Sequence, residues 1–173
     1  MATQAIKTPK GELEWVNISG EGKENLSGKM QYLCSIVLDP SEPEHKEFID
    51  QVNKYWEDNK PKGFTKPAKS TGLYPHKART DETDDSGKAV YEEDGLTVAT
   101  FKTSVTWPDG KAVKVRTFNA KGKEAALGDI QIGNGSIGRI SGSMGIYTNK
   151  LKNGTVLDAG VALYLRRCHS LAY

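Results

Sequence analysis

The densest group of side chains that could do chemistry is a set of four carboxylates: Asp81, Glu82, Asp84 and Asp85. Carboxylates this close together can hold a divalent cation for phosphodiester hydrolysis, but such sites are built on rigid elements. These four directly precede Ser86 and Gly87, which favour a turn. We therefore expect residues 80–94 to form a solvated acidic loop and not a nuclease site.

Histidine and cysteine provide no alternative reactive group. His45, His76 and His169 are far apart, and none has a carboxylate or thiol at a spacing typical of metal ligands. Cys34 and Cys168 lie in strand-like segments with no motif around them, so we predict two buried free thiols. We accordingly expect no metal, no cofactor and no catalytic residue.

One glycine-rich stretch imitates a dinucleotide-binding motif. Residues 133–138 match Gly-x-Gly-x-x-Gly, and Asp158 follows at about the distance of a ribose-binding carboxylate. That motif must open a helix, whereas Gly142 and Gly145 continue a pattern that is poor in helix formers and alternates like a strand. We predict a strand whose glycines permit tight curvature or close approach of a ligand backbone.

Cations interleaved with aromatic residues are the remaining candidates. Successive side chains of a strand point to opposite faces, so parity separates the residues into two sets. Phe101, Val105 and Trp107 fall on the apolar side, together with Val115 and Leu163. The opposite side collects the predicted site: Lys102, Lys114, Arg116, Phe118, Arg139 and Tyr147. Tyr164 and Arg166 also point away from the core by this parity.

This combination suits an unpaired nucleic-acid strand. Cations neutralise phosphates and release counterions, and each base stacked on a flat ring contributes about 1–3 kcal/mol whatever its identity. A duplex hides its base faces, so a stacking surface selects single strands. Two residues have an equally simple alternative: Phe118 could be a core residue at a bulge, and Tyr147 an ordinary surface residue near a turn.

The elements that must carry these residues are mostly strands. We predict strands over 12–19, 29–38, 96–107, 111–119, 136–147 and 155–169, with 96–107 and 111–119 forming a hairpin around Pro108. A helix over about 41–59 has Pro43 in its first turn and an apolar stripe of Phe48, Ile49, Val52, Tyr55 and Trp56. Short strands with frequent turns favour a sandwich or a barrel.

The net charge of +2 hides an asymmetry between the two parts of the chain. Residues 95–173 contain eleven Lys and Arg against four Asp and Glu, whereas residues 1–94 contain thirteen against eighteen. This predicts a polyanion-binding face on the C-terminal part. Residues 1–10 lack the apolar stretch of a signal peptide, and no run is long enough for a membrane span.

The sequence resembles the podovirus-type bacteriophage single-stranded DNA-binding proteins. The similarity lies mainly in 96–171, in the segments TFKTSVTW, FNAKGKE, IGNGSIGRISGSMGIY and GVALYLRR. It implies one OB-fold domain over 1–173: a mostly β, OB-fold-like five-stranded Greek-key barrel with one amphipathic helix and long loops. It also implies a stacking aromatic at the end of the glycine-rich strand, which Tyr147 matches, whereas a second position two residues later holds Asn149.

The resemblance further implies sequence-independent binding of single-stranded DNA in phage replication and recombination, in the cytoplasm of the infected bacterial host. The expected partner is single-stranded DNA, with phage polymerase and helicase as further partners. Relatives often end in an acidic tail that contacts such proteins. The sequence stops at Tyr173 without one, either because a tail has been removed or because the protein lacks it, so the sequence gives no support for tail-dependent contacts. An RNA-binding OB module and a phage structural or protein-interaction module are the alternatives.

Overall fold

The structure, a computed structural model, describes residues 3–119, 121–124 and 134–172, with side chains to Ser170. Its elements are β1 (Gln4–Lys7), β2 (Gly11–Asn17), β3 (Lys23–Glu24), β4 (Met30–Leu38), α1 (Pro43–Asn59), β5 (Leu73–Thr83), β6 (Ala89–Ser104), β7 (Arg116–Phe118), β8 (Ile137–Lys150) and β9 (Val156–Ala172). The predicted mostly-β class is confirmed. Within the described residues, no helix is long and apolar enough to cross a membrane.

Five strands close into a barrel. β2 pairs antiparallel with β4, and β4 with β6; β8 pairs antiparallel with both β9 and β2. The closing contact is parallel, between Lys102 of β6 and Tyr164 of β9. This is the strand order of an OB-fold, so the predicted five-stranded barrel is confirmed. Short β1 adds to β8 outside the barrel, and the sequence pattern did not predict it.

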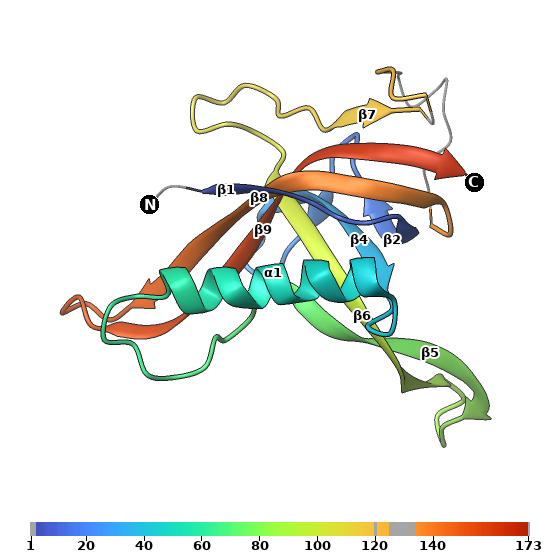
Figure 1. Cartoon of the computed structure of the whole chain (residues 1–173), viewed down its shortest axis with the longest axis horizontal. Coiled ribbons are helices and arrows are strands. Elements are labelled where there is room, and N and C mark those ends of the chain that lie inside the picture. The colour runs from blue at the N-terminus through green and yellow to red at the C-terminus, as the bar shows by residue number, and fades with distance from the viewer. Residues whose placement is uncertain (1–2, 120, 125–133, 173) are drawn as a thin grey trace.

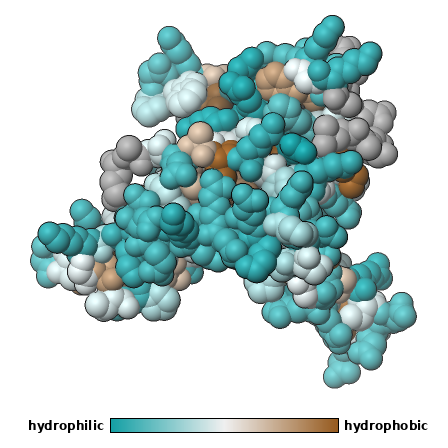
Figure 2. Space-filling view, in the orientation of Figure 1, coloured by the Kyte–Doolittle hydropathy of each residue, from teal (hydrophilic) through white to brown (hydrophobic). Residues whose placement is uncertain are grey.

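The helix α1 packs across the strands with its apolar stripe turned to the core (Figure 1). Phe48, Val52, Tyr55 and Trp56 are buried, and the rings of Phe48 and Phe101 lie 6.4 Å apart. Its outer side is hydrophilic, as the amphipathic pattern requires (Figure 2). The helix begins at Pro43, two residues later than expected, and ends at Asn59 as expected.

Both cysteines are buried free thiols, as predicted. The barrel brings them together: the contact with Cys168, followed by burial, raises the pKa of the Cys34 thiol. A thiol with a raised pKa is a poor nucleophile, which agrees with a packing role.

The prediction of an acidic loop over 80–94 is wrong. β5 and β6 form an antiparallel ribbon that projects from the barrel (Figure 1), with Lys77 opposite Glu93 and Arg79 opposite Tyr91. Its turn is closed by the Asp84 carboxylate, which accepts backbone N–H bonds from Ser86 and Lys88, and by Gly87 at φ +84°. The charges misled the prediction because an exposed two-stranded ribbon tolerates them as well as a loop does. We call residues 76–94 the arm.

The predicted hairpin after residue 96 is only half right. The tight turn exists, with Trp107 N–H bonded to the Lys111 carbonyl at 2.7 Å. Beyond it the chain leaves β6, and β7 pairs in parallel with β9. The glycine-rich stretch from Ile137 is a strand and not a helix, as predicted, although Gly133 lies outside the described residues.

Candidate nucleic-acid interface

A groove of about 550 Å³, here called the main groove, lies on the outer side of β6 and β9. Its walls come from the start of β4, residues 70–74, the turn at 106–108 and one position of β8. The residues used below are Lys29, Tyr74, Lys102, Trp107, Tyr147, Tyr164 and Arg166.

Regular alternation along β6 points Lys102 into this groove. Phe101 is fully buried in the core, so Thr100 and Lys102 on either side face outward and line the groove. The Thr100 hydroxyl lies 2.9 Å from the Ser35 hydroxyl of β4. This contact links β4 and β6 at the base of the groove. The outward position predicted for Lys102 is therefore confirmed.

Four aromatic residues line the main groove: Tyr74, Trp107, Tyr147 and Tyr164. Tyr74 is 42% exposed and Trp107 is 49% exposed, so their rings are accessible before any ligand arrives. Exposed rings beside a cationic groove are what successive unpaired bases require for stacking.

The Tyr147 ring crosses β9 because a glycine faces it. Tyr147 pairs with Gly160, and a Cβ on that glycine would lie 2.7 Å from the ring carbon Cε1 and 2.6 Å from the hydroxyl. Burial, and then the negative charge of Asp158, raise the pKa of Tyr147, so the hydroxyl stays neutral at physiological pH. Because Gly160 has no side chain, the Tyr147 ring can lie across β9 and form part of the groove wall.

Arg166 reaches the groove through a β-bulge. Ser141 pairs with Arg167 and Gly142 pairs with Leu165, which leaves Arg166 as the extra residue of β9. A Cβ on Gly142 would overlap the Tyr164 carbonyl oxygen, so only glycine permits this geometry. The Arg166 guanidinium carbon lies 6.0 Å from the centre of the Tyr164 ring.

The main groove is positively charged. Lys29, Lys102 and Arg166 line it, and its described lining includes no Asp or Glu. The ends of these long side chains can move to meet phosphates. Three of the four rings, those of Tyr74, Tyr147 and Tyr164, stand on strands, and Trp107 lies in a turn.

A second groove of about 580 Å³ adjoins the first, and Arg166 lines both. Its cations are Lys7, Lys114, Arg116, Arg166 and Arg167, and its described lining has no carboxylate and no aromatic ring. One cation is partly neutralised from outside the groove, because Glu124 accepts a hydrogen bond from Arg116 at 2.8 Å. The second groove therefore offers charge without stacking.

The six predicted site residues do not form one surface. Lys102 and Tyr147 line the main groove, and Lys114 and Arg116 line the second groove. Arg139 lies on β8 opposite His169, half-buried, and its Nε has no partner within the described residues. Arg139 lines neither groove.

Among the six predicted site residues, Phe118 is buried where exposure was predicted. It is 8% exposed, and its ring stacks on His169 at 4.7 Å between centres and 14° between planes. Arg116 and Arg167 lie over the same ring at 5.3 and 5.8 Å. The cause is the parallel pairing of β7 with β9, which turns this ring onto the strand and away from solvent. The alternative of a core position at Phe118 was correct.

Sequence reasoning missed several groove residues. Trp107 was assigned to the apolar side, but β6 ends at Ser104 and the following turn reorients the ring. Tyr74 follows an irregular, proline-rich stretch with no usable periodicity. Tyr164 and Arg166 have the outward orientation that parity predicted, although they were not part of the predicted site.

The fold matches solved structures of phage proteins. The crystal structure of gp2.5, a single-stranded DNA-binding protein encoded by bacteriophage T7, matches 99% of this chain and 87% of that protein at a TM-score of 0.63 and 18% identity. The C-terminally truncated single-stranded DNA-binding protein from bacteriophage Enc34 matches 98% of this chain and 86% of its own at 0.64 and 12%. The Enc34 protein in complex with single-stranded DNA matches over the same shares at 0.58 and 15%.

No protein-family model matches the sequence, and no curated protein has a significant match to it. At these identities, the likeness to the phage proteins establishes a shared fold.

Proposed function

We propose that this protein binds single-stranded DNA without sequence preference and so protects and organises unpaired DNA in phage replication and recombination. The observation that carries the proposal is the main groove, where four aromatic residues and three cations meet with no described carboxylate in the lining. The shared fold with the phage proteins supports it. The protein holds the strand and does no chemistry on it.

Stacking explains why a single strand is the ligand. Trp107 and Tyr74 can accept bases only from a strand whose base faces are free. Lys29, Lys102 and Arg166 bind phosphates and do not distinguish sequences.

The second groove extends the site. Because Arg166 lines both grooves, a strand in the main groove can continue past this arginine toward Lys114 and Arg116. We propose that residues 1–173 act as one binding domain in the host cytoplasm, where phage polymerase and helicase are the expected further partners.

Fluorescence titration with oligo-dT at several salt concentrations tests the proposal. Trp107 lies in the groove, so bound bases should quench its emission, over a background from the exposed Trp15 and the buried Trp56. The logarithm of the affinity should fall linearly with that of the salt concentration, by about 0.7 per phosphate contact for a single strand. A duplex of equal length should bind much more weakly, and equal affinity for both would contradict the proposal.

Competition between oligo-dT and oligo-rU separates DNA binding from the RNA alternative. Rings and cations do not read the sugar, so the groove itself allows both. Preference for the RNA strand would replace our proposal by an RNA-binding one. Failure of every oligonucleotide to bind at low salt would favour a protein-interaction module.

A further inference from the structure

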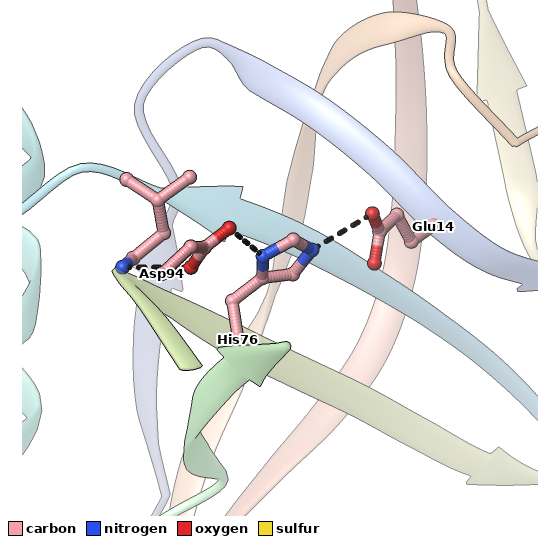
Figure 3. Close-up of polar contacts among 4 residues, drawn as sticks. Glu14, His76 and Asp94 are labelled. Carbon is pink, nitrogen blue, oxygen red and sulfur yellow. Dashed lines mark hydrogen bonds and ion pairs between the residues drawn. The ribbon is translucent and has the colours of Figure 1, made fainter. Parts of the chain in front are cut away.

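One histidine is held between carboxylates from two other strands. The Nδ1 atom of His76 lies 2.6 Å from the Asp94 carboxylate, and its Nε2 atom lies 3.1 Å from the Glu14 carboxylate (Figure 3). The side chains of His76, Asp94 and Glu14 are 14%, 26% and 27% exposed, so the cluster is partly shielded from water. We call these three residues the latch.

The contacts favour a protonated ring. A carboxylate oxygen only accepts hydrogen bonds, whereas a neutral imidazole has one donor and one acceptor nitrogen. Both nitrogens of His76 face carboxylates, so only the doubly protonated, cationic ring can donate a hydrogen bond to each of them. Burial alone would lower the pKa of His76, but the hydrogen bonds and charges of Asp94 and Glu14 outweigh it and raise the pKa above the ordinary 6.5.

The latch joins the arm to the barrel at the point where their pairing breaks. The β5–β6 register shifts between Pro75 and Lys77, opposite the turn that contains Gly95 at φ +82°. Asp94 stabilises this turn by accepting the Leu96 N–H at 3.0 Å. Glu14 belongs to β2, a barrel strand that is not a ladder neighbour of β5. The latch thus connects β5 to β6 and β2 through side chains at the point where the backbone pairing of β5 with β6 is interrupted.

The same segment is a wall of the main groove. Tyr74 lines the groove two residues before His76, and its hydroxyl lies 3.0 Å from the Ser70 hydroxyl. The beginning of this wall is fixed by backbone bonds, from Thr100 N–H to the Gly72 carbonyl and from Val161 N–H to the Ser70 carbonyl, both at 2.9 Å. Tyr74 itself pairs with Val98 of β6, and the ladder continues to Pro75 opposite Thr97 before it breaks. The latch follows at this break and ties the segment to β2.

We propose that His76 is a positioning residue for the main groove: as a cation between Glu14 and Asp94, it holds the wall that carries Tyr74 in its binding position. This inference rests on the proposed function. Other charged residues next to the latch are Lys77 and Glu93, which pair with each other across the arm. Strand β4, between β2 and β6, contributes no acidic or basic side chain.

The expected pH dependence has a definite sign. A histidine whose pKa is raised by its partners contributes fully below its ordinary pKa, and the contribution is lost as the pH rises through the raised value. The affinity for single-stranded DNA should therefore fall as the pH rises from about 6 to about 9, by about fivefold or more.

The test measures oligo-dT affinity against pH at constant salt for the full chain. We expect His76→Gln to bind as weakly at low pH as the unaltered protein does at high pH, with a flat profile. Glu14→Gln, which keeps an oxygen acceptor but loses the charge, should reduce the slope. His45→Gln is the matched control: His45 contacts Asp39 N–H and the Lys10 carbonyl, away from the groove, and its variant should keep the full profile.

The unaltered protein keeps the proposal testable if a variant does not fold. By reciprocity, saturating oligo-dT should raise the imidazole pKa of His76, which NMR titration of the full chain measures. A protein that binds oligo-dT with a flat pH profile, or a His76→Gln variant with an unchanged one, overturns the positioning role and leaves the proposed function intact. Absence of oligo-dT binding at every pH overturns the proposed function itself.

Discussion

The main groove and the second groove are both lined by cations but differ in their rings. Both have cations and no carboxylate in their described linings, and Arg166 belongs to both. The main groove exposes Trp107 and Tyr74, whereas Phe118, on the strand that carries Arg116, is buried against His169. Positive charge alone marks where a polyanion can lie, and ring exposure decides where bases can stack.

The largest expected effect is on stability and comes from the buried ring. Phe118→Ala removes a packed ring and its stack with His169, so we expect a loss of about 3 kcal/mol or more in the free energy of unfolding, measured in urea. Oligo-dT affinity of the folded variant should change little. Phe118→Leu should lose less stability because it keeps most of the apolar volume.

If Phe118→Ala lost oligo-dT affinity while its free energy of unfolding stayed unchanged, Phe118 would be a DNA-contacting residue and not a packing residue. The distinction between a stacking groove and a purely charged groove would then fail.

Removal of a main-groove ring should weaken binding with little effect on folding. Tyr147→Ala should cost about 1–3 kcal/mol of oligo-dT binding, since the ring spans β9 where a base can lie on it. The loss should persist at high salt because stacking is not ionic. Tyr91→Ala is the control, because Tyr91 is 57% exposed on the arm and outside both grooves.

Fluorescence titration at two salt concentrations measures both variants. Equal affinity of Tyr147→Ala and the unaltered protein would remove Tyr147 from the site.

Charge removal in the second groove should have the smallest effect at moderate salt. Lys114→Ala should lower the slope of the logarithm of affinity against that of salt by about 0.7, and the difference in affinity should vanish as salt rises. Arg116→Ala should do less, because Glu124 already pairs with Arg116. Glu124→Gln should free that arginine and steepen the slope.

Lys46→Ala serves as the control for charge, since Lys46 pairs with Asp50 on α1 and lines neither groove. If the salt slope of the affinity fell equally in Lys46→Ala and Lys114→Ala, the effect would come from the net charge of the protein. The second groove would then not be a DNA contact.

Prediction succeeded where strands are regular. Along β6, alternation placed Phe101 inside and Lys102 outside, and the structure agrees up to Ser104. It failed where a strand ends or bulges. Trp15 follows the buried Leu13 at an inward spacing, yet it is 62% exposed, because a register shift after Glu14 leaves Trp15 at φ +52°.

The latch shows a different limit. His76, Glu14 and Asp94 are distant in the chain, and no spacing rule links a histidine to carboxylates on two other strands. Only the bend between the arm and the barrel brings them within hydrogen-bond distance.

The sequence by itself determined the strand-rich composition, the amphipathic helix and the excess of positive charge after residue 94, because these depend on residue type and local periodicity. The tertiary structure decided which rings stay exposed, that Arg166 joins the two grooves, and that His76 lies between two carboxylates. Each of these depends on which strands become neighbours and where their register slips, and neither property is encoded within a single segment of the chain.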